Sequence, residues 1–312
     1  MKLQAPFPYF GGKSKISDIV WSRFGDVKHY IEPFAGSLAV LLARPHDVST
    51  QLETVGDLNG FLANFWRALQ DAPEELAQRA GGPLLEVDMH AQRKALVTSE
   101  EHLTQALLCD DKYYDIEKAA HWVQGICSWI GKGYPYVSNR SRPQLHSGDG
   151  IYSLTRRNDL PTLFGHLSSR IKNVRICCSS WEKLVSPYVL HGKSGTGITG
   201  VFLDPPYTDK AGREDDLYGI DSLQVGYEVA SWAIENGDNP NLRIAVCGYQ
   251  GEYTFPSTWE EVAWSTQGGM SNFSDQENKN SSKERVWFSP HCMTLDASWE
   301  NSPVYSVLQF LS

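Results

Sequence analysis

The sequence predicts an α/β protein whose main domain is a doubly wound, mostly parallel sheet with helices on both faces. Apolar segments with strand character alternate with segments of helical spacing near both ends of the chain. The middle of the chain interrupts this alternation with a different composition. We therefore expect a discontinuous α/β domain, residues 1–60 with 173–312, and an inserted, mainly helical domain at residues 61–172.

The first expected elements are two strand-to-helix connections. Residues 29–42 (HYIEPFAGSLAVLL) predict an apolar strand, a turn of small residues and a helix. Residues 54–59 (TVGDLN) predict a short strand that ends in an acid, and residues 61–69 (FLANFWRAL) predict an amphipathic helix. Strands joined by helices in this way are typical of a doubly wound sheet.

The remaining elements follow in chain order. Residues 70–121 are acidic with helical propensity, whereas residues 122–172 are rich in Gly, Ser, Tyr and Arg. Beyond this interruption the apolar segments resume and predict further strands and one helix. The expected strands are 174–179, 200–203 and 243–248, with a helix near 225–236 and a closing antiparallel pair formed by 259–264 and 285–289.

Composition places the chain among ordinary globular proteins. Apolar residues make up 41% and charged residues 21%, which excludes a globally disordered chain. No apolar run reaches the roughly 18 residues that a membrane span needs, and the charged first residues do not fit a signal peptide. We therefore expect a cytoplasmic protein with no membrane partner.

The six cysteines predict neither a disulfide framework nor a metal site. Their spacing matches neither CxxC pairs nor the Cys/His patterns of zinc sites, and the histidines show no ligand spacing. We therefore expect no metal, and reduced, mostly buried thiols. The cysteines are Cys109, Cys127, Cys177, Cys178, Cys247 and Cys292.

Charge is distributed unevenly along the chain. The net charge of −9 argues against an indiscriminate binder of polyanions. Residues 121–172, however, hold seven cations and two acids, a local balance of +5. This balance, with aromatic residues at 129, 134 and 136, favours contact with a nucleic-acid backbone, although a solvated surface would carry the same charges. The candidate contacts are Lys132, Arg140, Arg142, Arg156 and Arg157.

The tetrapeptide Asp204-Pro205-Pro206-Tyr207 carries the strongest chemical signal. It directly follows an apolar strand, and ligands of open α/β sheets bind beyond the carboxyl ends of the strands. Two consecutive prolines fix the backbone and remove two N–H donors, so this segment offers acceptors. The Asp204 carboxylate and a carbonyl can accept both hydrogens of an exocyclic amino group, and the Tyr207 ring can stack on a base.

These groups meet the requirements of methyl transfer to a nucleobase amine. The lone pair of such an amine is delocalised into the ring, which makes the amine a poor nucleophile. Hydrogen bonds that hold the NH2 group out of conjugation localise that pair, and Asp204 stabilises the positive charge that develops. The sequence therefore predicts catalytic roles for the whole tetrapeptide, with turn capping as the alternative role of Asp204.

Several segments of the chain resemble the Dam-like alpha group of N6-adenine DNA methyltransferases. Residues 6–13 (PFPYFGGK), 32–37 (EPFAGS), 57–59 (DLN) and 204–207 (DPPY) are similar to the motifs of that family, in its order. The resemblance implies a Rossmann-like sheet that uses S-adenosylmethionine as methyl donor, with residues 61–172 as the target-recognition domain. It also implies a bacterial host cell and a phage or prophage origin.

The amino-terminal motif supplies the first residues that the resemblance assigns to the donor. It implies that Tyr9, Gly12 and Lys13 contact S-adenosylmethionine, with Lys13 as a suitable partner for the donor's carboxylate. A tight Gly-Gly turn followed by a solvated lysine is the alternative. Asp204 also belongs to the implied donor-binding set.

The first two strands supply the other donor contacts. Gly36, in a loop between strand and helix, fits a close approach of the backbone to the donor, with Phe34 packing nearby. Glu32 is either a surface acid or an orienting group for the donor's ammonium. Asp57 stands where nucleotide-binding sheets place an acid against ribose hydroxyls, and its alternative role is a helix N-cap.

The leading functional hypothesis is methyl transfer to N6 of an adenine that is flipped out of double-stranded DNA. The same chemistry on cytosine N4 or on RNA adenine is the first alternative. Glutamine amides are substrates of related Asn-Pro-Pro-Tyr enzymes, and the aspartate at position 204 favours a nucleobase instead. A noncatalytic DNA-binding or anti-restriction protein on the same scaffold is the alternative from another class. We expect a monomer or weak dimer.

Overall fold

The computed structural model describes most of the chain. The described residues are 3–9, 13–45, 51–129, 133–137, 142–144, 150–153, 159–191, 197–206, 221–264 and 284–294. Six of the candidate residues lie outside these ranges, so their roles stay predictions. They are Gly12, Lys132, Arg140, Arg156, Arg157 and Tyr207.

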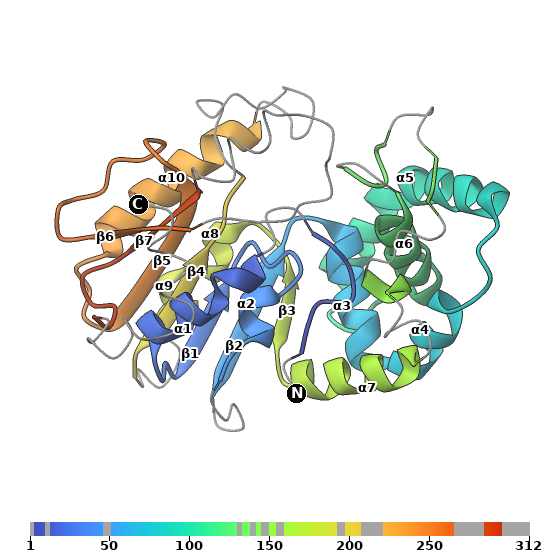
Figure 1. The fold of residues 1–312 in the computed structure, drawn as a ribbon, viewed down its shortest axis with the longest axis horizontal. Coiled ribbons are helices and arrows are strands. Elements are labelled where there is room, and N and C mark those ends of the chain that lie inside the picture. The colour runs from blue at the N-terminus through green and yellow to red at the C-terminus, as the bar shows by residue number, and fades with distance from the viewer. Residues whose placement is uncertain are drawn as a thin grey trace. The chain divides into compact units, whose positions relative to one another are not determined.

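A seven-stranded sheet organises the fold, in the order β3-β2-β1-β4-β5-β7-β6 (Figure 1). The pairs β1–β4, β2–β3 and β4–β5 are parallel, whereas β7 pairs antiparallel with both β5 and β6. The predicted α/β class, the mostly parallel sheet and the closing antiparallel pair are thereby confirmed. The strands are β1 (His29–Glu32), β2 (Leu52–Asp57), β3 (Arg175–Cys178), β4 (Thr199–Leu203), β5 (Leu242–Tyr249), β6 (Glu260–Ala263) and β7 (Glu284–Phe288).

Helices follow most of the strands and fill the middle of the chain. The α-helices are α1 (Ser17–Phe24), α2 (Ala39–Leu42), α3 (Gly60–Asp71), α4 (Pro73–Ala80), α5 (Glu86–Cys109), α6 (Ile116–Ser128), α7 (Leu160–Ile171), α8 (Trp181–Leu184), α9 (Pro187–His191) and α10 (Asp221–Asn236). Two 3-10 helices are η1 (Lys13–Lys15) and η2 (Gly150–Tyr152). Among helices of the described ranges, none has the length and apolar character needed to cross a bilayer.

The chain divides into two compact units. The first unit comprises Met1–Gly12, Ala35–Ala43 and Glu53–Val185, and the second comprises Lys13–Phe34, Arg44–Leu52 and Ser186–Ser312. The whole predicted insertion, residues 61–172, falls in the first unit, which also contains β2 and β3. The functional boundaries at 61 and 172 stay predictions.

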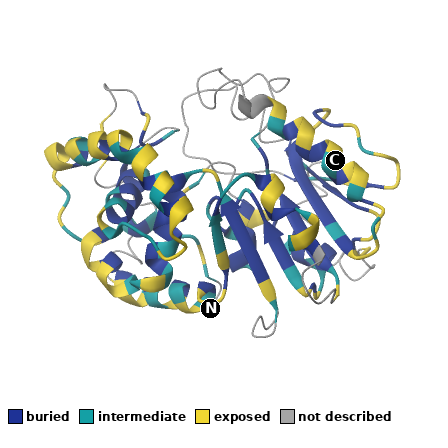
Figure 2. Cartoon of the chain, turned by 180° about the vertical axis from the view of Figure 1, so that it is seen from behind, coloured by how far each residue is buried: buried dark blue, intermediate teal, exposed yellow. Residues whose placement is uncertain are grey.

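The second unit has its core around β4 and β5. Every residue of β4 is buried, as is expected for a parallel strand covered on both faces, and Figure 2 shows the strands as the darkest part of the molecule. Gly200 in β4 permits close packing, because a Cβ there would lie 2.9 Å from Cδ2 of Phe24. The small residue thus lets α1 pack closely against the sheet.

The first unit is held together by an aromatic core. Phe7 lies with its ring centroid 5.3 Å from that of Phe65, 5.5 Å from that of Trp66 and 5.0 Å from that of Trp122. The rings come from the amino-terminal segment, α3 and α6, so this cluster ties residues that are distant in sequence. Helix α3, predicted at 61–69, begins at Gly60 and ends at Asp71.

Residues 122–172 contain more helix than their composition indicated. Helix α6 extends to Ser128, and α7 begins after Asp159, whose side chain accepts a hydrogen bond from the Thr162 backbone N–H. An N-cap aspartate followed by a proline in the first turn is a recognisable start signal. The Gly, Ser and Arg content of the segment obscured it in the sequence.

Two helical glycines give a matched test of this packing. A Cβ at Gly125 in α6 would collide with Cζ of the buried Tyr134, whereas a Cβ at Gly165 in α7 would meet nothing within 4 Å. We expect Gly125→Ala to lower the free energy of unfolding by about 1–3 kcal/mol through overpacking. Gly165→Ala should raise it by about 0.5–1 kcal/mol, because alanine favours the helix. Urea unfolding measures both, and equal stabilisation by the two changes would contradict the placement of Tyr134.

Candidate active site

The catalytic candidate Asp204 lies immediately after β4, in the second unit. The side chain is 18% exposed, and Pro205 and Pro206 continue the chain with Pro205 buried. The ammonium Nζ of Lys13 lies 2.9 Å from Oδ1 of Asp204, and the Lys13 side chain is only 6% exposed. The structure therefore pairs the lysine that was predicted to meet the donor's carboxylate with the carboxylate that was predicted to be catalytic.

Lys13 keeps its proton in this environment. Burial acts to lower the pKa of Lys13. The charge of Asp204, with smaller contributions from Cys247 and Glu284, acts in the opposite direction and outweighs burial, so the pKa is raised above its ordinary value. The ring of Trp264 adds a cation–π contact, with its centroid 5.4 Å from Nζ. Lys13 is thus a buried, charged partner of Asp204, and the alternative of a solvated lysine is wrong.

Further carboxylates are buried in the same unit. Glu32, at the end of β1, is 3% exposed, and its Oε2 accepts a hydrogen bond of 3.0 Å from the Tyr30 hydroxyl. The interpretation of Glu32 as a surface acid is therefore wrong, while its role toward an ammonium stays a prediction. Glu284 in β7 is also buried, at 6% exposure.

The pKa of the Cys247 thiol in β5 depends on the charges of the candidate site. Burial raises its pKa well above the ordinary value, and the charges that act on the thiol are those of Asp204, Lys13, Glu284 and Glu32. The charges that act on this thiol thus come from three carboxylates and one ammonium. Such an acidic environment favours positive charge that develops nearby.

In the first unit, Asp57 holds a loop in place at the end of β2. Its Oδ2 accepts a hydrogen bond of 3.2 Å from the Gly36 N–H, and its Oδ1 accepts one of 2.9 Å from the Asn59 N–H. The N-cap of α3 is Asn59, whose side chain accepts from Phe61 and Leu62. The N-cap interpretation of Asp57 is therefore wrong, and its ribose role stays a prediction.

Burial also changes the acidity of Asp57. Desolvation raises its pKa to about 6, although the backbone N–H groups of Asn59, Gly36 and Leu58 act in the opposite direction. The half-buried carboxylate is charged at neutral pH and becomes neutral in mild acid. Leu58, the next residue, is 68% exposed and places an apolar side chain beside this acid.

Gly36 has a conformation that other residues rarely adopt. Its φ is +44°, and a Cβ there would lie 2.8 Å from Cδ1 of Tyr9. Its carbonyl accepts a hydrogen bond of 3.1 Å from the indole N–H of Trp66. Tyr9, Gly36 and Asp57 therefore lie together, and their role toward the donor stays a prediction. Phe34 is half-buried and belongs to the second unit.

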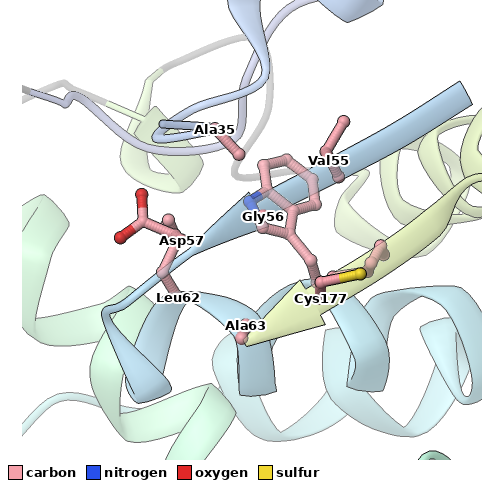
Figure 3. Close-up of a pocket in the computed structure, with 9 residues that line it drawn as sticks. Ala35, Val55, Gly56, Asp57, Leu62, Ala63 and Cys177 are labelled. Carbon is pink, nitrogen blue, oxygen red and sulfur yellow. The ribbon is translucent and has the colours of Figure 1, made fainter. Parts of the chain in front are cut away.

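A small pocket adjoins Asp57 in the first unit (Figure 3). Figure 3 shows the Asp57 carboxylate on one side and the Cys177 thiol on the other. The lining is otherwise apolar, and the pocket is too small to enclose a nucleoside by itself. The lining residues are Ala35, Val55, Gly56, Asp57, Leu62, Ala63, Trp66, Ile176 and Cys177.

The segment predicted to contact nucleic acid is only partly described. Arg142 is exposed, as a phosphate contact must be. Trp129 and Tyr134 are buried, with ring centroids 5.3 Å apart, so Tyr136 is the aromatic residue of the three that is exposed, at 56%. Arg170 counted toward the local charge of +5, yet it binds Glu53 through two hydrogen bonds of 2.7 and 2.8 Å and stabilises the fold.

Three features of the site were not found in the sequence. Trp264 and Glu284 lie far along the chain from Lys13, and no local pattern marks them as neighbours. Leu58 follows Asp57 directly, so an apolar residue after a strand-ending acid could have been singled out.

All six cysteines are free, and Cys127, Cys178, Cys247 and Cys292 are buried, as predicted.

Comparison with known families identifies a domain in this chain. Residues 9–122 match the model of the D12 class N6 adenine-specific DNA methyltransferases. The chain contains a domain of this family. The predicted family is thereby confirmed, over roughly a third of the chain.

The D12-class match contains Tyr9, Lys13, Gly36 and Asp57, whereas Asp204 lies beyond its last residue. It also runs through α3, α4 and α5, which belong to the predicted insertion. Among curated proteins, no sequence matches the chain. Within the described residues, no group of three or more His, Cys, Asp and Glu side chains could hold a metal ion.

Proposed function

We propose that this D12-class chain transfers a methyl group from S-adenosylmethionine to N6 of an adenine that is flipped out of duplex DNA. The observation that carries the proposal is the carboxylate of Asp204, which pairs with Lys13 at the carboxyl end of β4 and is followed by two prolines. Flipping is part of the proposal because N6 lies within the base pair, where an acid at the edge of the sheet cannot reach it.

The residues of the first unit fit the methyl donor, which supplies the methyl group when bound. A Cβ at Gly36 would collide with the Tyr9 ring, so this loop presents bare backbone. The Asp57 carboxylate accepts the backbone N–H groups of Gly36 and Asn59, and a carboxylate has acceptor capacity beyond these for a ribose hydroxyl. The adjoining pocket and the exposed Leu58 offer apolar surface to the nucleoside.

Asp204 has the chemistry that activation of an amine needs. Its carboxylate accepts a hydrogen of the NH2 group, and a carbonyl of the proline segment, where no N–H competes, accepts the other. The amine lone pair is then localised on nitrogen, and the negative charge of Asp204 stabilises the cationic nitrogen that forms as the new bond is made. We assign Tyr207 to stacking on the base.

DNA contact is assigned to residues 61–172. Arg142 and Tyr136 are exposed there and supply a phosphate contact and an aromatic surface. The cations Lys132, Arg140, Arg156 and Arg157 complete the proposed backbone contacts. Because these contacts are to phosphates, the affinity for DNA should fall steeply as the salt concentration rises. The net charge of −9 also limits nonspecific binding, so the chain can dissociate from nonspecific DNA.

The N6-adenine specificity in the name of the matching family favours adenine in DNA over cytosine N4 and RNA adenine. A noncatalytic scaffold is disfavoured by the ion pair itself. A buried ammonium and a strand-end carboxylate are costly to place without water, and a chain that only binds DNA has no need of them.

The assignment of Asp204 is tested by Asp204→Ala, with Asp238→Ala, an exposed acid of the same unit, as the matched control. Tritium transfer from labelled donor to duplex DNA measures turnover. We expect Asp204→Ala to lose about two to three orders of magnitude, because the acceptor and the stabilising charge are both removed. Asp238→Ala should behave as the parent protein. Turnover of Asp204→Ala close to the parent value would remove Asp204 from the chemistry.

The pKa of Asp57 predicts how donor binding depends on pH. The pKa of about 6 means that the carboxylate is ionised above pH 6 and protonated below it. If ribose hydroxyls donate to the carboxylate, donor affinity falls as pH drops through 6, by up to about tenfold per pH unit. Calorimetry from pH 5 to 8 measures this, and Asp57→Asn should bind weakly with no such decline. A pH-independent affinity in the parent protein would return Asp57 to a purely structural role.

A further inference from the structure

Lys13 occupies a position that the assignment of donor contacts did not anticipate. The resemblance placed it on the carboxylate of the methyl donor. The structure places its ammonium 2.9 Å from Oδ1 of Asp204, with the side chain 6% exposed. An ammonium buried against the catalytic acid acts first on that acid.

We propose that Lys13 is a positioning residue for Asp204, which holds the carboxylate ionised and oriented as an acceptor, and that it is not a ligand of the donor's carboxylate. This inference rests on the proposed function, because it concerns the acid that activates the target amine. According to this inference, Lys13 affects the rate of methyl transfer and does not affect the affinity for the donor.

Charge around the pair explains why Asp204 needs a cation. The charges of Asp204, Glu32 on β1 and Glu284 on β7 all act on the Cys247 thiol of β5, and Lys13 is the cation among them. Glu252 and Tyr253, after β5, contribute a further acid and phenol, and the Tyr253 hydroxyl is subject to the charge of Asp204. Carboxylates gathered in this way favour protonation of one another.

A protonated Asp204 would be a poor catalyst. Its acid proton would make one oxygen a donor, so it could not accept from the amine in the same geometry, and it would bring no charge to stabilise the cationic nitrogen. An ammonium 2.9 Å from Oδ1 favours the charged form of this carboxylate. The ring of Trp264, 5.4 Å from Nζ, covers the ammonium with an apolar face that still favours a cation.

The arrangement also limits what Lys13 can do for the donor. The lysine belongs to η1, packed with α1 inside the second unit, and its charge is shared with Asp204 and Glu284. A donor carboxylate would have to compete with an acid of the chain for the same ammonium. The pairing with Asp204 therefore sets the role of this residue.

The test compares Lys13→Met with Lys15→Met, an exposed lysine two residues further along the same 3-10 helix. Calorimetry measures donor affinity, and single-turnover transfer at saturating donor measures the rate from pH 5.5 to 8.5. We expect Lys13→Met to bind the donor within about threefold of the parent protein and to transfer about a hundredfold more slowly. In Lys13→Met, the pH below which the transfer rate declines (the acid limb of the rate profile) should be higher than in the parent protein by one pH unit or more. Lys15→Met should match the parent protein throughout.

Two further measurements keep the result decisive. Lys13→Arg retains the charge, so the acid limb should stay at the parent position even if the rate is reduced. Carbon-13 NMR of labelled aspartate, with the Asp204 signal assigned from Asp204→Ala, should show a raised carboxyl titration in Lys13→Met and not in Lys13→Arg. This readout requires no turnover, so it remains informative if the parent protein transfers no methyl group to DNA, a result that would contradict the proposed function instead.

The opposite pattern would overturn the inference. If Lys13→Met weakens donor binding tenfold or more and recovers the parent rate at saturating donor, Lys13 is a donor ligand. An unchanged Asp204 titration in Lys13→Met would also contradict it. If Lys13→Met fails to fold by circular dichroism, a loss of donor affinity in Lys13→Arg with a normal acid limb would likewise identify Lys13 as a donor ligand.

Discussion

The ion pair between Lys13 and Asp204 is the interaction on which the proposed chemistry of this chain depends. An acid that activates an amine must be charged, yet the second unit buries Glu32 and Glu284 near the same strand ends. Carboxylates in that setting tend to take up protons. The buried ammonium of Lys13 favours the charged form of Asp204, and the charge of Asp204 in turn raises the pKa of Lys13. The two prolines that follow keep this carboxylate at the edge of the sheet.

A second acid has a comparable role in the first unit. Asp57 accepts the backbone N–H groups of Gly36 and Asn59, and thereby fixes the loop that begins at the positive-φ glycine. Trp66 binds the Gly36 carbonyl from the other side, and Phe7 joins Trp66 to the aromatic core. Loop geometry is therefore set by the core of the unit, and the Asp57 carboxylate retains lone pairs for a ligand.

Local patterns in the sequence were enough to predict the strands, α3 and the position of Asp204, because each depends on apolar periodicity or on adjacent residues. Asp57 was placed at its strand end for the same reason. Contacts between distant segments could not be predicted: nothing local brings Lys13 to Asp204, Trp264 over the ammonium, or Arg170 onto Glu53. The interpretation of Glu32 as a surface acid was wrong because its burial depends on the packing of distant segments. The interpretation of Asp57 as a helix N-cap was wrong because Asn59 caps α3 in the folded structure. Helix α7 was missed because its cap lay in a segment of loop-like composition.

The exocyclic amine of adenine is the group that we assign to activation by Asp204, and the product of the reaction tests that assignment most directly. Duplex DNA incubated with the chain and S-adenosylmethionine would be digested to nucleosides and analysed by mass spectrometry. We expect N6-methyladenine as the modified nucleoside. N4-methylcytosine, or DNA without methylated nucleosides after incubation with the folded chain, would contradict the assignment.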